Sequence, residues 1–318
     1  MSITSYIKEI GRGKEGARAL STDQAHDLMS QVLEGQVTDL ELGAFAMAMR
    51  IKGETVDELA GFLKAATSRC LPIVCPRTAV VLPSYNGARK LPNLTPLLAL
   101  MLAQEGVPVL VHGMPDDPSS RVTTSDIFRD LGLPMARSAD DVTQAWLRHE
   151  PVFIRTDVLC PPLARLLDAR WTIGLRNSGH TMAKLLDSCP PGAAMRVVNY
   201  THPEYASMLT EFLQRTAASA MLMRGTEGEP VADARRLPKL DVFIDGVLRA
   251  DLSCAAQDGT LRELPVLPRT CDASTTAMYI QSVISGEKPA PAPLTQQVAV
   301  LLQSLAALEH EPPQEKSA

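Results

Sequence analysis

The sequence has few aromatic residues, no long apolar run and no export signal, and each absence argues against a class of protein. Aromatic side chains make up 4% of the 318 residues, which disfavours a binding site built on base stacking. No apolar run reaches the roughly 18–20 residues that a membrane-spanning helix needs. The first residues, Met1–Tyr6, lack the basic and apolar regions of a secretory signal. We therefore expect a cytoplasmic protein with no membrane partner.

Paired or clustered cysteines are also missing. The six cysteines form no C-x-x-C pair and do not group with histidines. Without an export signal, such cysteines are expected to be reduced and mostly buried thiols. The spacing therefore predicts no metal centre, and we expect the protein to bind neither a metal nor another cofactor.

An excess of positive charge is absent as well. The formal net charge is −5, whereas nucleic-acid-binding domains are commonly basic. The charge is unevenly distributed, however, because a cluster of cations lies near the N-terminus: Lys8, Arg12, Lys14 and Arg18. Residues 309–318 are acidic and contain prolines, and they predict a disordered tail.

Helix-start signals recur through the N-terminal part of the chain. The S/T-x-x-E/Q capping box, in which the first hydroxyl and the later acid or amide exchange hydrogen bonds with backbone N–H groups, begins at Ser21, Thr38 and Thr55. Apolar residues at helical spacing follow each box. The pattern predicts a small helical bundle domain over residues 1–72.

A different pattern begins near residue 76 and predicts a large α/β domain over residues 76–308. Short apolar or β-branched runs favour strands at 79–82, 109–111, 152–154, 195–198, 220–223 and 242–244. Predicted helices lie between them, and such alternation is typical of a mostly parallel central sheet covered on both faces. The helical stretch at 162–187 is unusually long for a connection between strands, so we assign it to the helical domain.

The segment from Val80 to Thr95 reads as a buried strand, a turn and the start of a helix. Such turns often bind phosphate, because backbone N–H groups and a helix N-terminus converge there. This turn contains one glycine and the adjacent cations Arg89 and Lys90. The β-carbons of Tyr85 and Asn86 restrict the close backbone approach that a diphosphate requires.

Several ordered segments give the chain a resemblance to anthranilate phosphoribosyltransferases: 93–95, 111–113, Asp126, 170–176 and 202–205. The resemblance covers residues 5–305. It implies a helical bundle joined to an α/β domain, a fold shared with pyrimidine nucleoside phosphorylases. It also implies an inherited cleft, formed by Ser84, Asn86, Gly87, Asn93, Thr95, His112, Gly113, Asp126 and Arg170.

The departures from that family concern its catalytic parts. Its glycine-rich G-T-G-G-D loop corresponds to residues 83–87, where all three glycines and the aspartate are replaced and the one glycine present, Gly87, falls at the position of the acid. Its magnesium-binding acidic pair corresponds to Pro230 and Val231, which cannot ligate a hard cation. Glu227 and Glu229 nearby are alternative ligands. Because phosphoribosyl transfer needs metal and positioned donors at the leaving diphosphate, we assign no catalytic residue.

A closer resemblance is to the YbiB-type group within this fold, carried by residues 7–14, 50–55, 83–90 and 175–181. It implies a homodimer that binds DNA and RNA without sequence specificity. We expect the dimer to form through the helical domain, whose first three helices offer an apolar face to a symmetric partner. The cations expected to contact nucleic acid are Lys8, Arg12, Lys14 and Arg18, followed by Arg50, Lys52, Arg89, Lys90, Arg176 and Lys184.

Other interpretations stay open. The chain could be a phosphoribosyltransferase that uses magnesium, phosphoribosyl diphosphate and an aromatic acceptor, with Asn93, Thr95, Asp126 and Arg170 as its surviving site. It could also bind a nucleotide in the old cleft without turnover. The N-terminal cations could form a solvated helical face paired with Glu9 and Glu15, since charge runs often lie on solvent-exposed surfaces. His112 could be a hydrogen-bonded structural histidine.

Overall fold

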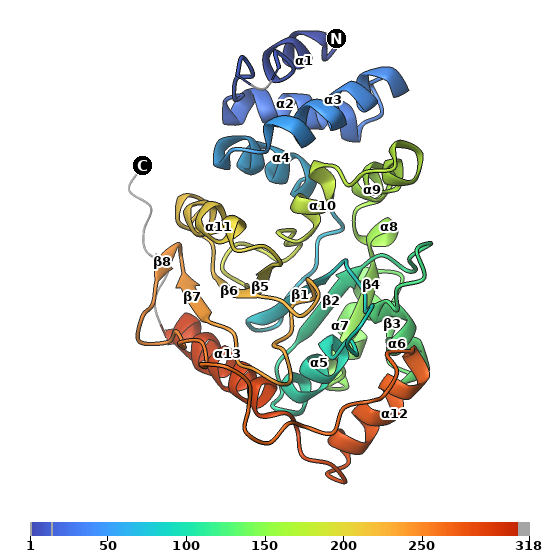
Figure 1. Ribbon diagram of the computed structural model, residues 1–318, viewed down its shortest axis with the longest axis vertical. Helices are drawn as coiled ribbons and strands as arrows, with labels where there is room; N and C mark the ends of the chain where they lie inside the picture. The colour runs from blue at the N-terminus through green and yellow to red at the C-terminus, as the bar shows by residue number, and fades with distance from the viewer. Residues whose placement is uncertain (1, 14, 311–318) are drawn as a thin grey trace. The chain divides into compact units, whose positions relative to one another are not determined.

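A computed structural model describes residues 2–13 and 15–310, which form two compact units (Figure 1). The helical unit comprises the chain up to Leu71 together with Thr156–Ser188. The α/β unit comprises Pro72–Arg155 and the chain from Cys189 onward. Lys14 and most of the expected tail, residues 311–318, lie outside the described residues.

The helical unit contains the predicted bundle. Its helices are α1 (Thr4–Ile10), α2 (Thr22–Leu33), α3 (Asp39–Lys52), α4 (Val56–Thr67), α8 (Thr156–Leu159), α9 (Pro161–Ile173) and α10 (Ser178–Ala183). All three predicted capping boxes are confirmed: Ser21, Thr38 and Thr55 each exchange both hydrogen bonds with the third residue of the helix that follows. Local side-chain chemistry therefore determines where α2, α3 and α4 begin.

Close helix packing forms the core of the helical unit. A β-carbon at Gly61 of α4 would lie 2.3 Å from the Thr22 carbonyl oxygen of α2, so only glycine fits at this contact. The buried rings of Phe45 and Phe62 meet edge to face, with centroids 5.9 Å apart. Such aromatic pairs add to the free energy gained from burying the rings.

The α/β unit is built on a sheet of eight described strands in the order β3-β4-β2-β1-β5-β6-β7-β8. The strands are β1 (Ala79–Ser84), β2 (Val109–Gly113), β3 (Met135–Ala136), β4 (Val152–Arg155), β5 (Ala194–Tyr200), β6 (Ala220–Arg224), β7 (Leu240–Ile244) and β8 (Val247–Leu248). Pairings among β1 to β6 are parallel, and β7 and β8 join antiparallel. The predicted mostly parallel sheet is confirmed.

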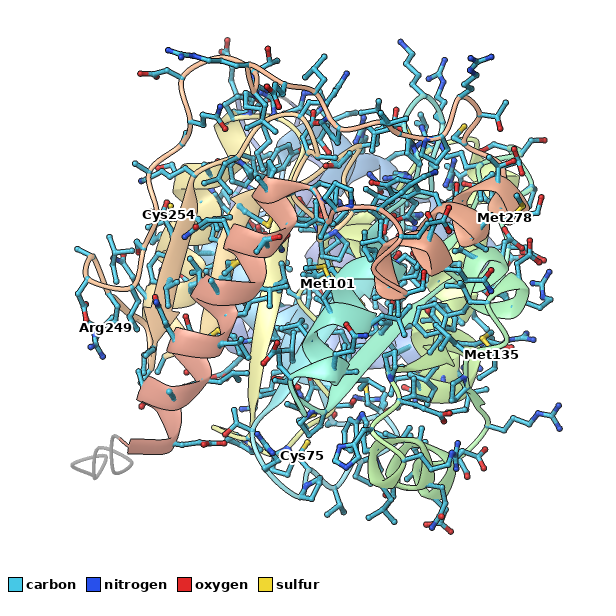
Figure 2. All side chains as sticks on the ribbon, turned by 90° about the horizontal axis from the view of Figure 1, so that it is seen from below. Cys75, Met101, Met135, Arg249, Cys254 and Met278 are labelled. Atoms are coloured by element: carbon cyan, nitrogen blue, oxygen red, sulfur yellow. The ribbon has the colours of Figure 1, made fainter. Side chains whose placement is uncertain are left out.

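Helices cover this sheet: α5 (Thr95–Gln104), α6 (Thr124–Asp130), α7 (Ala139–Leu147), α11 (Glu204–Arg215), α12 (Ala273–Ile284) and α13 (Ala292–His310). Alternate strand residues such as Val80 and Leu82 join one core with apolar residues of α5, α6, α12 and α13. Figure 2 looks onto the side of α12 and α13, with Met101 of α5 labelled between them and the exposed Met278 on α12. The residues between these alternates, such as Val81, are also buried, as expected for a sheet with two covered faces.

Two predicted boundaries differ from the structure. Helix α13 extends to His310, so Glu309 and His310 are helical and do not begin a tail. The predicted helical stretch at 162–187 contains two helices, α9 and α10, because α9 ends at Gly174 with φ of 78°. Arg176 consequently lies in the connection between them, not on a helix as expected. None of the helices described is both long and apolar enough to cross a membrane.

Candidate functional site

Within the predicted segment from Val80 to Thr95, a loop of residues 84–91 begins at the last residue of the central strand β1. The chain continues from β1 to β2 on one side, and β5 later pairs with β1 on the other side. Ligands of open α/β sheets bind beyond the carboxyl ends of strands at such a reversal of strand order. The loop therefore occupies the position where this type of fold binds its ligands.

The carboxylate of Glu229 fills this loop. Its Oε1 accepts hydrogen bonds from the backbone N–H groups of Asn86 and Gly87, each at 2.7 Å. Its Oε2 accepts one from the Ser84 hydroxyl. Glu229 is only 1% exposed. The donors that would face a bound anion are therefore directed at a carboxylate of the same chain.

Glu227 extends the same arrangement along the loop. Its carboxylate accepts hydrogen bonds from the backbone N–H groups of Arg89 at 2.7 Å and Lys90 at 3.0 Å. Its carbonyl oxygen accepts a further one from the Asn86 side chain at 2.9 Å. We call Glu227 and Glu229 the glutamate pair. Together they accept hydrogen bonds from the backbone between residues 86 and 90.

A tight turn presents the glutamate pair. Thr226 and Glu229 form a bridge, and Glu227 and Gly228 between them have φ of 53° and 86°. Positive φ at both central residues is typical of a type I′ turn. A β-carbon at Gly228 would lie 1.8 Å from Nδ2 of Asn86, so a side chain there would clash with the loop. Glycine is therefore needed for both the turn and the close approach.

A polar network joins other residues of the expected cleft. The Ser84 and Thr124 hydroxyls lie 2.6 Å apart, and the Asn93 amide donates to Thr124 Oγ1 at 2.7 Å. Asn93 Oδ1 accepts from the Thr95 backbone N–H at the start of α5. Asp126 instead caps its own helix, α6, since its carboxylate accepts from the Thr123 N–H and hydroxyl groups. The structure thus brings Ser84, Asn93 and Thr95 together.

His112 and Gly113 serve packing at the end of β2. His112 is buried, and its Nδ1 lies 2.8 Å from the Tyr85 hydroxyl. A β-carbon at Gly113 would lie 2.0 Å from the Ser84 carbonyl oxygen, so glycine allows β1 and β2 to approach closely. These contacts agree with the structural interpretation of His112.

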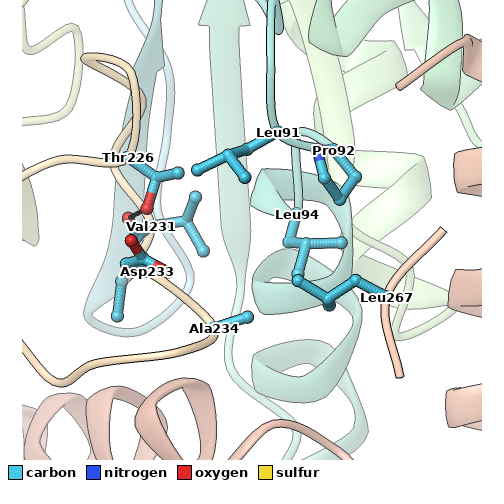
Figure 3. Close-up of a pocket in the computed structure, with 9 residues that line it drawn as sticks. Leu91, Pro92, Leu94, Thr226, Val231, Asp233, Ala234 and Leu267 are labelled. Atoms are coloured by element: carbon cyan, nitrogen blue, oxygen red, sulfur yellow. Dashed lines mark hydrogen bonds between the residues drawn. The ribbon is translucent and has the colours of Figure 1, made fainter. Parts of the chain in front are cut away.

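A small, mainly apolar pocket lies beside the glutamate pair, between Leu91 to Leu94 and residues 226–234 (Figure 3). Val231, which the resemblance places at one of the family's magnesium-binding acids, lines it. Among residues 2–13 and 15–310, no group of three or more His, Cys, Asp or Glu side chains is arranged to hold a metal. The carboxylates of the glutamate pair already accept backbone hydrogen bonds. The residues present therefore do not fit the magnesium ion that the fold family implies.

The N-terminal cations differ in their surroundings. Lys8, Arg12 and Arg18 are exposed at the end of α1 and beyond it, and Arg12 pairs with Glu9 at 2.7 Å. Arg50, in the last turn of α3, is also exposed. Lys52 is different, because its ammonium group lies 2.6 Å from the fully buried carboxylate of Glu58. Lys52 therefore stabilises the core of the helical unit.

A second group of cations surrounds His180 in the helical unit. Burial, together with the positive charges of Arg176, Arg170 and Lys184, lowers the pKa of His180 to about 3. The His180 ring is therefore neutral at physiological pH, and its Nδ1 accepts a hydrogen bond from the Asn177 N–H. The Arg170 guanidinium also lies 4.4 Å from the centre of the Trp171 ring. Arg170 belongs to the helical unit, whereas the other residues of the expected cleft belong to the α/β unit.

The sequence reasoning identified the loop but missed how its donors are satisfied. It treated Glu227 and Glu229 only as alternative metal ligands. The available signal was the Thr-Glu-Gly-Glu sequence, since glycine at the second central position of a short turn favours a tight hairpin. Nothing in the sequence alone indicates that this hairpin reaches a loop more than a hundred residues earlier in the chain.

Comparison with known proteins supports the family resemblance. The helical bundle domain of a glycosyl transferase family matches residues 4–70. The uncharacterized protein YbiB of Escherichia coli is 40% identical over 95% of this chain and 94% of its own length. An anthranilate phosphoribosyltransferase of Streptomyces griseus is 27% identical over 91% of this chain and 80% of its own length.

Solved structures show the same fold. Anthranilate phosphoribosyltransferase from Thermus thermophilus matches with a TM-score of 0.67 and 20% identity, over 95% of both chains. The Saccharomyces cerevisiae enzyme in complex with PRPP and Mg matches with a TM-score of 0.68 and 14% identity, over 96% of this chain and 89% of that one. At sequence identities of 14% and 20%, this similarity shows a shared fold and nothing more.

Proposed function

Because this chain belongs to the family of YbiB, which has the anthranilate phosphoribosyltransferase-like fold, we propose that it binds DNA and RNA without sequence specificity and does not transfer phosphoribosyl groups. The proposal has two parts, a loss of the ancestral ligand site and a gain of surface that binds polyanions. Each part rests on different residues and has its own test.

The observation that carries the proposal is the occupation of loop 84–91 by the glutamate pair. A diphosphate would have to displace Glu229 from the N–H groups of Asn86 and Gly87. It would then lie beside two carboxylates, and charges of like sign at such distances repel strongly where water is excluded. Phosphoribosyl transfer depends on donors that stabilise the leaving diphosphate. In this chain those donors already bind the glutamate pair.

Exposed cations support the nucleic-acid-binding part. Lys8, Arg18 and Arg50 have no acidic partner within residues 2–13 and 15–310. Each such cation can neutralise one phosphate and release a condensed counterion. The cations around His180, and the exposed side chains of Arg89 and Lys90, are further contacts in the proposal. Because phosphate contacts carry no sequence information, affinity should vary little with base sequence.

An exposed apolar stripe on α3 supports the homodimer part of the proposal. Leu40, Met47 and Ile51 are 83%, 39% and 64% exposed and follow one another at helical spacing. Contiguous exposed apolar patches commonly mark interaction surfaces. A second copy of the chain would cover this stripe and double the number of cations available, which raises affinity for a long polyanion through effective concentration.

The test of nucleic-acid binding is a fluorescence polarisation titration with labelled single-stranded and double-stranded oligonucleotides of several sequences at two salt concentrations. We expect similar affinities for all sequences and a steep loss of affinity with salt. Replacing Lys8, Arg12, Lys14 and Arg18 by alanine should reduce the slope of log affinity against log salt by about 1 for each phosphate that is no longer neutralised. Absence of binding at low salt would refute this part.

A charge-matched control separates a specific basic surface from net charge alone. Arg129, Arg148, Arg215 and Arg262 are four exposed cations of the α/β unit that are not among the proposed contacts. Their replacement by alanine should leave the salt slope nearly unchanged. The transferase alternative is tested by calorimetry with phosphoribosyl diphosphate and magnesium, for which we expect no heat of binding. Saturable binding followed by turnover of an aromatic acceptor would overturn the proposal.

A further inference from the structure

Two cysteines that are far apart in the sequence meet inside the helical unit. Cys70 lies just after α4, and Cys160 is the residue before α9. Both thiols donate to the carbonyl oxygen of Ala66, Cys70 at 3.4 Å and Cys160 at 3.6 Å. Each thiol is also close enough to shift the pKa of the other. The two sulfur atoms are therefore neighbours that share one acceptor.

The backbones beside these cysteines are held together as well. The Leu71 N–H group donates to the Leu159 carbonyl oxygen at 2.7 Å. This bond joins the residue after Cys70 to the residue before Cys160, so the two segments that carry the cysteines lie against each other. Disulfides most often span about 5.5–6 Å between α-carbons, which requires such closely held segments. A bond between the two sulfur atoms would form when both side chains rotate from their shared acceptor, the Ala66 carbonyl oxygen, toward each other.

The surroundings of Cys160 favour its ionised form. The neighbouring Cys70 thiol lowers the pKa of Cys160, and the Leu163 N–H group at the start of α9 and the charges of Arg69 and Arg165 act in the same direction. The same contact between the sulfurs, together with burial, raises the pKa of Cys70. The first proton lost by the pair therefore leaves a thiolate on Cys160. Thiolates are the reactive form of cysteine.

We propose that Cys70 and Cys160 are a redox modification site at which a hydroperoxide, such as hydrogen peroxide, forms a reversible disulfide. The Cys160 thiolate attacks one peroxide oxygen, the O–O bond breaks, and the hydroxide released takes up a proton to form water. The resulting sulfenic acid is attacked by the Cys70 sulfur, the S–O bond breaks, and the second oxygen leaves as water with the Cys70 proton. Two thiols are oxidised while the peroxide is reduced to two waters.

Burial limits which oxidants can reach Cys70 and Cys160. Cys160 is buried and Cys70 is half-buried, so only a small oxidant can reach the pair. The neighbouring Cys70 traps the sulfenic acid before a second oxidant arrives, which prevents the irreversible sulfinic acid from forming. The disulfide would tie the end of α4 to the start of α9. Both ends lie next to points where the chain passes between its units, at Leu71 and at Thr156.

The test is peptide mapping of the full-length protein after treatment with hydrogen peroxide, alkylation of the remaining thiols and digestion without reductant. We expect one linked peptide pair that joins Cys70 to Cys160, an intact mass lower by two hydrogen atoms, and full reversal by dithiothreitol. Oxidation should also raise the Tm by roughly 5–10 °C, because the bond closes a long loop.

Single-cysteine variants distinguish a disulfide between Cys70 and Cys160 from disulfides between other cysteines. Cys70→Ser and Cys160→Ser should abolish the linked peptide, whereas Cys75→Ser, a half-buried cysteine nearby in sequence, should retain it. Far-ultraviolet circular dichroism of each variant checks that it is folded. If the serine variants do not fold, the wild-type map alone decides. A wild-type map with no linked peptide, with a bond between Cys70 and Cys75, or with sulfinic acid at Cys160 would overturn the proposal.

Discussion

Loop 84–91 and the segment from Lys8 to Arg18 are both suited to binding anions, but the groups that would bind an anion have opposite surroundings. In the loop, buried backbone N–H groups donate to two carboxylates of the same chain. In the basic segment, side-chain cations are exposed, and the one ion pair among its described residues joins Arg12 to Glu9. The loop has an internal anion, whereas the segment remains available to an external one.

Under the proposed function, this difference would let the fold change ligands without changing its architecture. Among substitutions only proline removes a backbone N–H, so the donors of a loop must be satisfied in another way when their ligand is lost. A short hairpin with two glutamates achieves this in the α/β unit. Surface cations carry no comparable cost because water solvates them. The largest effects on stability should therefore come from the loop, and the largest effects on nucleic-acid binding from the basic segment.

The strongest disruption is expected from Glu229→Ala. It leaves three donors in the loop without their acceptor, and each buried unsatisfied donor costs about 1–3 kcal/mol. We expect the free energy of unfolding to fall by about 3–5 kcal/mol, measured by urea denaturation. The exposed Glu263→Ala serves as control and should change stability by less than about 0.5 kcal/mol.

A milder variant separates the charge of the glutamate pair from its shape. In the double variant Glu227→Gln with Glu229→Gln, the amides keep part of the hydrogen bonding but remove both negative charges. Inorganic diphosphate should raise the Tm of this variant and leave that of the wild type unchanged. Stabilisation of the wild type by diphosphate would contradict the idea that the loop is filled.

Lys52 and Lys8 compare a buried cation with an exposed one. Lys52→Met leaves the buried Glu58 carboxylate without its cation, which we expect to cost about 3 kcal/mol. Lys8→Met should change stability by less than about 0.5 kcal/mol but should weaken oligonucleotide binding. Chemical denaturation and polarisation titrations of both variants measure the two effects. Equal effects of both variants on stability would contradict the distinction.

Stability should fall in acid because of His180. Its pKa is about 3 in the folded protein, against about 6.5 for a histidine in an unfolded chain. Between these values the unfolded chain binds more protons, so the His180 contribution to stability is present above pH 6.5 and is lost as the pH falls toward 3. His180→Gln keeps an acceptor for the capping box and removes the titration. Urea denaturation at several pH values should show a shallower pH dependence for this variant.

The smallest effect is expected from Glu9→Gln. This substitution removes the partner of Arg12 from an exposed ion pair, which contributes less than about 0.5 kcal/mol to stability. It also frees Arg12 for phosphate contact. Oligonucleotide affinity at low salt should rise by about twofold and the difference should vanish at high salt. A loss of affinity would show that the pair holds Arg12 in its binding position.

Local signals predicted the fold well. Capping boxes fixed the starts of α2, α3 and α4, because the residues that form them lie three apart in the sequence. Short apolar or β-branched runs located the main strands, because each run lies within one stretch of the sequence. The short strands β3 and β8 were not predicted, since two residues carry too little pattern.

The candidate site was predicted only in part. The loop after β1 was identified from its position between a strand and a helix. Its occupation by the glutamate pair depends on a contact between residues 86 and 229, and no local pattern encodes such a contact. The same holds for Lys52, whose role depends on the burial of Glu58. The assignment of Lys8, Arg12, Lys14 and Arg18 to nucleic-acid contacts remains a prediction.

The occupation of loop 84–91 by the glutamate pair depends on a single residue, Gly228. One hydrogen atom on its α-carbon faces the Asn86 amide, where a methyl group would lie 1.8 Å away. A single-nucleotide change from a glycine codon to an alanine codon would therefore push the hairpin away from the loop and expose its donors to solvent. One substitution, at a residue outside loop 84–91, would therefore release the backbone donors of this loop from the glutamate pair.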